Sequence, residues 1–334
     1  MLTAAFSYHL PPQQIAQTPA RPRDSARLLV YQRQTGQVTQ QVFRNLPKIL
    51  QSGDVLVLNE TKVIPARLRT QAGREIFLLK ALQPKTWRCL VRGGKHFLAG
   101  QELTIAPKFT GKVQTVLPSG ERVITFRTPN FLKALTRYGH TPLPPYIQPN
   151  DFNTKKYQTI FARRAGSVAA PTAGLHFTPR VFRHLKQAGQ QVVKINLTIG
   201  PGTFLPVKTK QLEDHPMHTE AFELSPAAAQ LLNQAKKAGR RIFAVGSTSC
   251  RVLESCVQAN GFLKAQKNQT ALFIKPGYQF KFIDGLLTNF HLPCSTLIML
   301  VAAFLGREKT LELYHFAVQA KYRFYSFGDA MLLL

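Results

Sequence analysis

Acidic residues are scarce in this chain of 334 residues, where 16 aspartates and glutamates stand against 44 lysines and arginines. The formal charge of +28 predicts a polyanionic partner. The excess is +15 over residues 1–150 and +13 over residues 151–334, which excludes a disordered basic tail as its source. Residues 61–150 hold 15 basic and 3 acidic side chains, so this segment is the predicted contact with phosphate. A host whose proteins are basic throughout is the alternative explanation.

Cysteines and long apolar runs are also few. The four cysteines form no Cys-x-x-Cys pair, which argues against a zinc ribbon or a thioredoxin motif and favours reduced thiols. No basic region followed by an apolar core opens the chain, and the longest apolar stretch, Leu297–Leu305, is too short to cross a bilayer. We therefore expect no export, no membrane insertion and a cytoplasmic location.

Three nucleotide or hydrolase motifs are missing as well. No Gly-x-x-x-x-Gly-Lys-Ser/Thr loop and no Gly-x-Gly-x-x-Gly after a strand occurs, so ATP hydrolysis and a Rossmann dinucleotide site lose their usual support. Gly-x-Ser-x-Gly is absent too, which argues against the hydrolase elbow.

The most informative segment that is present runs from Gly166 to Thr178 and has neither helical nor strand periodicity. Small side chains around one proline leave room for a ligand, and His176 is the only group there that titrates near neutrality. Thr178 followed by Pro179 is typical of a helix start, so the loop is predicted to end at a helix N-terminus that favours an electron-rich group. A tight linker with a hydrogen-bonded histidine is the plainer interpretation.

Hydrophobic patterning divides the chain into two parts with different patterns of predicted secondary structure. Residues 1–63 and 147–334 alternate helix and strand signals, which predicts an α/β main domain with a mostly parallel sheet. Residues 64–146 show short β runs separated by glycine and proline, which predicts an inserted small β-barrel domain or a sandwich. The predicted strands of this insertion are Glu75–Lys80, Trp87–Val91, Glu102–Ile105, Gly111–Leu117 and Arg122–Phe126.

Polar loops follow several predicted strands of the main domain. If the strands are parallel, their ends bring these loops to one edge of the sheet, where open α/β sheets bind ligands. The loops are Asn59–Arg67, Gly200–Phe204, Glu213–Glu220, Gly246–Arg251 and Thr288–Thr296. His215, His218 and Glu220 also permit a metal interpretation, but Pro216 interrupts any helix that would align them and no further ligand pair is evident, so we expect no metal.

Ten segments in order resemble the S-adenosylmethionine:tRNA ribosyltransferase-isomerase family of the queuosine pathway. They cover nearly the whole chain. Two positions depart from the family pattern: Glu60 stands where relatives usually carry aspartate, and Ser7 replaces an acidic residue. The matching segments are Arg27–Val30, Gly53–Arg67, Tyr157–Thr159, Gly166–Thr178, Gly200–Phe204, Glu213–Glu220, Gly246–Arg251, Pro276–Tyr278, Leu286–Thr296 and Tyr322–Met331.

The resemblance implies transfer and isomerisation of the ribosyl part of S-adenosylmethionine onto 7-aminomethyl-7-deazaguanine at the tRNA wobble position, which gives epoxyqueuosine and releases adenine and methionine. It implies tRNA and S-adenosylmethionine as partners, the latter a consumed co-substrate, with no cofactor; we expect a monomer. A methyltransferase acting on RNA and a non-catalytic RNA-binding protein remain the alternatives.

Roles follow for individual residues. His176 is the leading acid or base, followed by His215, His218 and His291. Tyr146 and Phe324 are candidates for stacking a base. The substrate-binding set is Asn59, Thr61, Arg67, Thr172, Gly174, Gly200, Gly202, Thr203, Glu220, Thr248, Arg251, Tyr278, Thr288 and Asn289.

Overall fold

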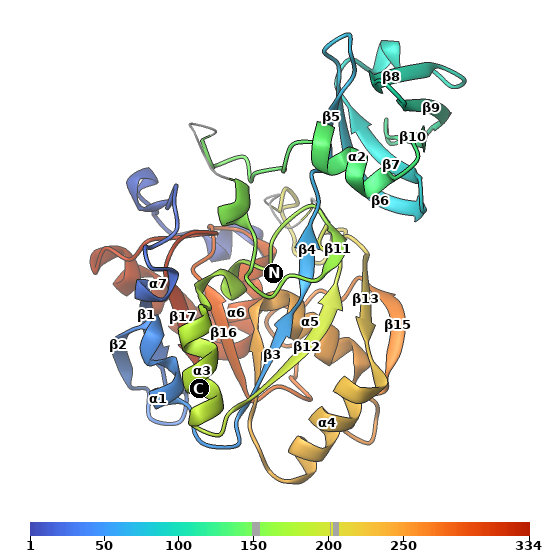
Figure 1. Ribbon diagram of the computed structural model, residues 1–334. Helices are drawn as coiled ribbons and strands as arrows, with labels where there is room; N and C mark the ends of the chain where they lie inside the picture. Colours follow the sequence, from blue (N-terminus) through green and yellow to red (C-terminus); the bar gives the residue numbers. More distant parts are fainter. Residues whose placement is uncertain (149–153, 201, 203–206) are drawn as a thin grey trace.

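The computed structural model describes residues 1–148, 154–200, 202 and 207–334. A large α/β part carries a smaller β part at one end (Figure 1). The large part is built on a nine-stranded sheet in the order β15-β13-β12-β3-β14-β16-β17-β1-β2. These strands are β1 (Arg27–Tyr31), β2 (Val38–Val42), β3 (Val55–Asn59), β12 (Gln191–Leu197), β13 (Glu220–Leu224), β14 (Ile242–Val245), β15 (Gln266–Thr270), β16 (Gly285–Asn289) and β17 (Ala330–Leu333).

The sheet is mixed, so the prediction of a mostly parallel sheet is not confirmed. Strands β12, β3, β14 and β16 run parallel, and so do β17 and β1. The pairs β15/β13, β13/β12, β16/β17 and β1/β2 are antiparallel. Parallel pairing needs a long crossover, whereas β1 turns directly into β2 over residues 32–37 and must return antiparallel.

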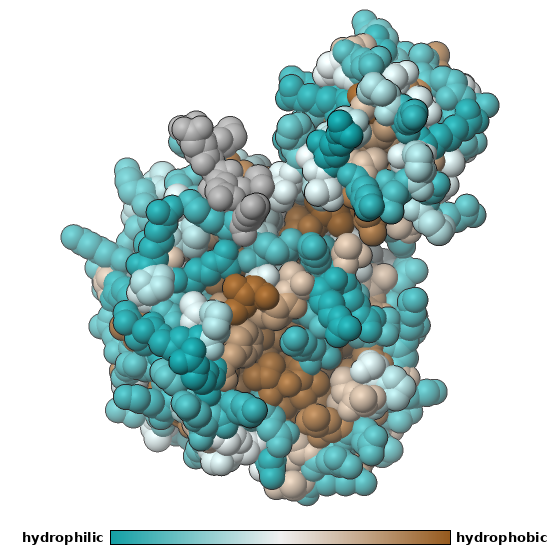
Figure 2. Space-filling model, viewed as in Figure 1, coloured by the Kyte–Doolittle hydropathy of each residue, from teal (hydrophilic) through white to brown (hydrophobic). Residues whose placement is uncertain are grey.

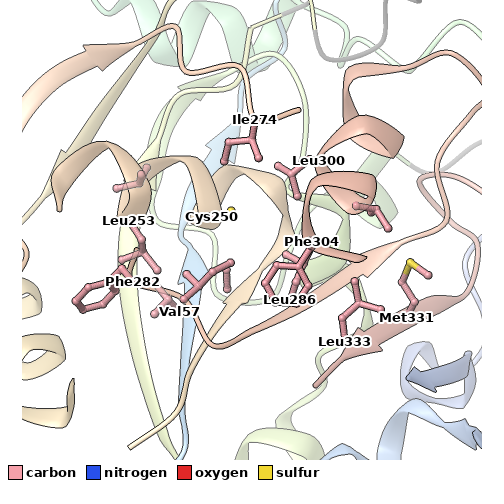
Figure 3. Close-up of a cluster of buried hydrophobic side chains, with 14 of the residues drawn as sticks. Val57, Cys250, Leu253, Ile274, Phe282, Leu286, Leu300, Phe304, Met331 and Leu333 are labelled. Carbon is pink, nitrogen blue, oxygen red and sulfur yellow. The ribbon is translucent and has the colours of Figure 1, made fainter. Parts of the chain in front are cut away.

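Helices cover both faces of the sheet, which explains why the central strands β3 and β14 carry apolar residues on both faces, apart from Asn59 at the end of β3. In β3, Val57 packs in one cluster with α4, α5, α6 and α7, while its neighbour Leu58 packs in a second cluster with α1 and α3. Figure 3 shows part of the first cluster, with Leu253 of α5 and Phe304 of α6 over the sheet. The helices of this part are α1 (Leu46–Ile49), α3 (Pro179–Gln187), α4 (Pro226–Lys237), α5 (Gly246–Cys256), α6 (Thr296–Leu305) and α7 (Arg307–Gln319).

The smaller part is a six-stranded antiparallel sheet in the order β5-β6-β7-β10-β9-β8, rolled into a nearly closed barrel. The Gln71 amide, two residues past β5, donates to the Thr104 carbonyl of β8 (2.8 Å), which brings the two edges of the sheet together. Its own apolar cluster, containing Trp87 and Phe131, fills the interior, and the predicted barrel strands are confirmed. The elements are β5 (Arg67–Arg69), β6 (Glu75–Gln83), β7 (Thr86–Val91), β8 (Glu102–Ala106), β9 (Phe109–Val116), β10 (Arg122–Arg127) and α2 (Phe131–Tyr138).

A narrow neck joins the two parts. The outgoing chain forms β4 (Thr61–Val63), which pairs parallel with β11 (Arg164–Ser167). Beside it, Arg67 and His140 exchange backbone hydrogen bonds of 3.1 and 2.8 Å. A Cβ added to Gly139 would lie 2.3 Å from the Pro65 carbonyl, so the outgoing and returning chains can approach this closely only because residue 139 is glycine.

Side-chain caps start the helices at the places that the sequence indicates. The Thr178 hydroxyl accepts from the Val181 amide at the start of α3, and the Ser225 hydroxyl accepts from the Ala228 amide at the start of α4. In the part of the chain that the structure describes, we find no helix with both the length and the apolarity needed to cross a membrane.

Candidate functional site

Two neighbouring hollows lie where the parallel strands end. The carboxyl ends of β3, β12, β14 and β16 share one edge with the first residues of β13 and β17, because those two strands run the opposite way. We call the hollows the Arg251 hollow and the Asn289 hollow, each after a residue that lines it. The predicted gathering of polar loops at this edge therefore occurs, although the sheet is mixed.

Both hollows are lined by the first turn of α5, because Ser247 and Thr248 belong to each, and they also share Leu297 from the start of α6. Gly246 has a φ of 81°, which allows the chain to turn sharply from β14 into the helix. The first amides of a helix have no partner within it and attract electron-rich groups. Among the described residues, the buried hydroxyl oxygen of Thr248 finds no hydrogen-bond partner, which leaves it for a molecule bound in the hollows.

A buried ion pair forms one wall of the Arg251 hollow. The Arg251 guanidinium bonds a carboxylate oxygen of Glu220 through Nη1, and it donates to the carbonyls of Leu272 (3.1 Å) and Thr270 (3.2 Å). The other carboxylate oxygen of Glu220 accepts from the Gly200 amide at 2.8 Å. These contacts tie the loop after β12 to β13 and α5, so both charged residues hold the wall in place.

His215 and His218 also line the Arg251 hollow. His215 is half-buried, with its ring 5.6 Å edge-to-face from Phe273. Burial, and secondarily His218, lowers the pKa of His215, which keeps its imidazole neutral near pH 7. His218 is exposed, and its ring occupies the space of a side chain on Gly202, where an added Cβ would lie 2.0 Å away.

The polar end of β16 forms a wall of the Asn289 hollow, together with Thr172. Thr288 Oγ1 lies 2.9 Å from Nε2 of His291, and the His291 amide donates to the Tyr314 hydroxyl at 3.2 Å. Burial lowers the pKa of His291 to about 3, so its imidazole is neutral over the physiological range.

His176 lies behind this wall, in the 3-10 helix Thr172–His176, and lines neither hollow. Its Nε2 lies 3.1 Å from the side-chain amide nitrogen of Asn289, and its ring stacks on Phe43 with centroids 5.0 Å apart. Burial, followed by the charges of Arg323 and Arg23, lowers the pKa of His176 to about 3. The segment Gly166–Thr178 is thus less irregular than predicted, and its histidine is packed inside.

Tyr325 and Ser326 line the Asn289 hollow, and sequence reasoning did not select them. Tyr325 has a φ of 75°, a region that residues with a side chain seldom adopt. The Tyr146 ring lies 3.9 Å from that of Tyr325, and its hydroxyl hydrogen-bonds Ser326. The family-matching segment Tyr322–Met331 was the signal for this region, but the residue selected from it for base stacking was Phe324, which is fully buried.

Asn59 and Thr61 satisfy their polar groups inside the protein and line neither hollow. The Asn59 side-chain amide donates to the Leu197 carbonyl (3.0 Å), and its oxygen accepts from the amides of Thr61 and Leu197 at 3.1 Å. Thr61 Oγ1 lies 2.5 Å from Ser167 Oγ. These side chains join β3 to β12 and β4 to β11.

Further predicted site residues lie away from the hollows. Arg67 is exposed in the barrel, 3.7 Å from Glu75. Tyr278 donates to Glu254 (3.0 Å), a buried carboxylate that also accepts three backbone amides. Gly174 packs against Phe161, and Thr203 lies outside the described residues.

Glu60, which differs from the family pattern, is buried and lies 3.4 Å from Arg164, which also pairs with Glu223. Ser7, the other residue that differs from the family pattern, is exposed.

The N-terminus of α3 does not face a ligand site either. Thr178 and Arg180 both bond the buried carboxylate of Asp24, with Oγ1 to Oδ2 at 2.6 Å and Nη2 to Oδ1 at 2.8 Å. The electron-rich group expected at this helix is therefore supplied by the chain itself.

Over the described ranges, no three His, Cys, Asp or Glu side chains gather as they would around a metal ion.

This arrangement is that of an α/β enzyme with a polar site at its strand ends and a small basic barrel beside it. A family model described as "Queuosine biosynthesis protein" matches residues 3–333. The chain is similar to proteins named "S-adenosylmethionine:tRNA ribosyltransferase-isomerase" from Desulfitobacterium hafniense, at 47% identity over 336 residues, and from Moorella thermoacetica, at 49% over 337 residues; each alignment covers 98% of both chains.

A solved structure shares the fold. The crystal structure of an S-adenosylmethionine tRNA ribosyltransferase from Thermotoga maritima aligns with a TM-score of 0.57 and 35% identity, covering 99% of this chain and 100% of that chain. The chain belongs to the queuosine biosynthesis family, so the resemblance predicted from its sequence motifs is confirmed.

Proposed function

We propose that this protein is an S-adenosylmethionine:tRNA ribosyltransferase-isomerase. It transfers and isomerises the ribosyl group of S-adenosylmethionine onto 7-aminomethyl-7-deazaguanine at the tRNA wobble position, giving epoxyqueuosine and releasing adenine and methionine. The observation that carries the proposal is the family match over residues 3–333, nearly the whole chain.

S-adenosylmethionine lies, in this proposal, across the first turn of α5, with its parts in the two adjoining hollows. Support comes from Ser247 and Thr248, which line both hollows, and from the Thr248 hydroxyl, which has no partner among the described residues. The molecule is consumed in the reaction, so it is a co-substrate, and we propose that no cofactor or metal assists it.

The reaction needs a base and an acid. The sulfonium of S-adenosylmethionine acidifies the C5′ hydrogens, one of which must be removed, and the departing adenine must receive a proton. We assign these transfers to His215 and His218, because their rings line the Arg251 hollow and burial keeps His215 neutral. His176 ranked first by sequence but lines neither hollow.

The tRNA is held, in this proposal, by an inserted barrel domain of residues 64–146 on an α/β domain of residues 1–63 and 147–334. The barrel has its own apolar core. Its visible surface is largely hydrophilic (Figure 2), and many of its lysines and arginines are exposed. Because phosphate contacts supply most non-specific affinity for nucleic acid, this surface suits a tRNA arm. We further propose that the protein acts as a monomer in the cytoplasm.

The test mixes the protein with S-adenosylmethionine and tRNA bearing 7-aminomethyl-7-deazaguanine, then quantifies free adenine and the mass of the modified nucleoside. One adenine per epoxyqueuosine formed is the expected result. S-adenosylhomocysteine in place of adenine would identify a methyltransferase, and tight tRNA binding without turnover would identify a binding protein.

Variants test the assignment of the proton transfers. His215→Gln and His218→Gln are each compared with His184→Gln, a substitution at an exposed histidine of α3 that lines neither hollow. Loss of an acid or base lowers turnover by about 10²–10⁴-fold, so at least one of the first two variants should fall in that range. Near-normal kcat in both would refute the assignment.

A further inference from the structure

Asn289 presents a buried acceptor that nothing in the described protein satisfies. Its side-chain nitrogen donates to Nε2 of His176 (3.1 Å) and to the Asp329 carbonyl (3.4 Å). Its side-chain oxygen is buried and has no hydrogen-bond partner among the residues that the structure describes. An unpaired buried acceptor costs free energy, which a ligand donor would recover. Asn289 lines the Asn289 hollow whereas His176 does not, so the amide oxygen is the atom left for a bound molecule.

The orientation of this amide is fixed by its two acceptors. The Asp329 carbonyl cannot donate, so the atom that bonds it must be the amide nitrogen. That nitrogen also faces Nε2 of His176, which must then accept, and a neutral imidazole that accepts at Nε2 carries its proton on Nδ1. The stacked Phe43 ring holds the imidazole in place.

We infer that His176 is a positioning residue that holds the Asn289 amide so that its oxygen accepts a hydrogen bond from a ribosyl hydroxyl of S-adenosylmethionine. The unpartnered Thr248 hydroxyl lines the same hollow and supplies a second polar contact for the same sugar. This inference rests on the proposed function, and it names the part of the co-substrate that the Asn289 hollow holds.

The ionisation of His176 agrees with this geometry. Burial and the nearby guanidiniums of Arg323 and Arg23 lower its pKa to about 3, which keeps Nε2 free to accept at working pH. A base in the reaction would need access to the C5′ hydrogens, whereas Nε2 of His176 already faces Asn289.

Glutamine at position 176 separates positioning from proton transfer. The amide oxygen of Gln can accept from Asn289 as Nε2 does, but Gln cannot act as a base. We expect H176Q to bind S-adenosylmethionine within about threefold of wild type and to lose no more than about fivefold in kcat. H176L, which has no acceptor, should weaken binding as much as N289A does, by roughly threefold to tenfold.

Calorimetry with S-adenosylmethionine alone, in the absence of tRNA, measures these dissociation constants. Analogues that lack the 2′- or the 3′-hydroxyl complete a double-mutant cycle with N289A. If Asn289 accepts from one of these hydroxyls, the matching analogue loses affinity for wild type but little further affinity for N289A. Additive losses with both analogues would overturn the inference, and so would a defect of N289A that appears only in the KM for tRNA.

A second result would overturn the role of His176. If folded H176Q binds S-adenosylmethionine normally but loses about 10²-fold or more in kcat, the imidazole takes part in proton transfer. Because H176L can fail to fold, H176Q is the deciding variant, and its fold is checked by circular dichroism. Wild-type adenine release is measured first, so failure of the proposed reaction is distinguished from failure of this inference.

Discussion

Two buried histidines make this protein sensitive to mild acid. His176 and His291 are each 5% exposed, and burial lowers the pKa of each from an ordinary 6.5 to about 3. In the unfolded chain both imidazoles take up a proton below pH 6.5, whereas in the folded protein they stay neutral until about pH 3. Their contribution to stability is therefore complete above pH 6.5 and is lost as the pH falls from 6.5 towards 3.

The size of the effect follows from the two pKa values. Between the ordinary histidine pKa and pH 5, an interval of about 1.5 pH units, the histidine is protonated in the unfolded chain but not in the folded protein. Each pH unit of such a difference lowers the free energy of unfolding by about 1.36 kcal/mol. Each histidine therefore removes about 2 kcal/mol of stability between pH 7.5 and pH 5, and the two together about 4 kcal/mol. That is a large part of the roughly 5–15 kcal/mol that stabilises a typical domain.

Urea unfolding followed by far-ultraviolet circular dichroism at pH 7.5 and pH 5.0 measures this loss. H176Q and H291Q should each reduce the loss by about 2 kcal/mol, because glutamine does not titrate. Carboxylates with a lowered pKa, such as Glu213, lose their contribution to stability only below pH 4.5, so they do not affect the comparison between pH 7.5 and pH 5.0. A wild-type change of less than about 1 kcal/mol, or the full loss in both variants, would refute the reasoning.

Two further predictions concern charge. Arg251→Met leaves the buried Glu220 carboxylate without its partner and should lower the free energy of unfolding by about 3–5 kcal/mol, measured by urea titration. The double variant with Glu220→Gln should lose less than the sum of the two single variants; additive losses would show that the pair is not coupled. In the barrel, replacing both exposed residues Arg92 and Lys95 by Gln in one variant should make tRNA affinity less dependent on salt concentration. The slope of log affinity against log salt should fall by the amount expected for the loss of up to about two phosphate contacts. Lys264→Gln, at an exposed site of the large part, is the control; equal slopes for all three proteins would argue against barrel binding.

Local sequence patterns predicted many of the helices and strands, because each pattern reflects a condition for helix or strand formation that involves only a few neighbouring residues. Alternating apolar residues marked the barrel strands, and Ser225 and Thr178 marked the starts of α4 and α3. The order of strands in the sheet could not be found in this way. Strand β17 pairs with β1, about 300 residues away along the chain, and no local pattern encodes that contact.

The same limit applies to the site. Polar residue types after strands predicted which loops meet at the sheet edge, since strand ends gather there. Which side chains face a ligand depends on the partners that each finds after folding. Asn59 and Asn289 both stand at the end of a central strand. Within the described part of the chain, the polar side-chain atoms of Asn59 are all bonded, whereas the oxygen of Asn289 is not.

The sequence by itself determined the family, the division of the chain into an α/β part and a β part, and the polar loops that meet at the sheet edge, because these depend on residue types and their order. Only the tertiary structure decided that the sheet is mixed, that His176 is buried behind Asn289 and that Tyr325 reaches the same hollow. Burial and hydrogen-bond partners arise from contacts between residues distant in the chain, and these contacts set the ionisation and orientation of each side chain.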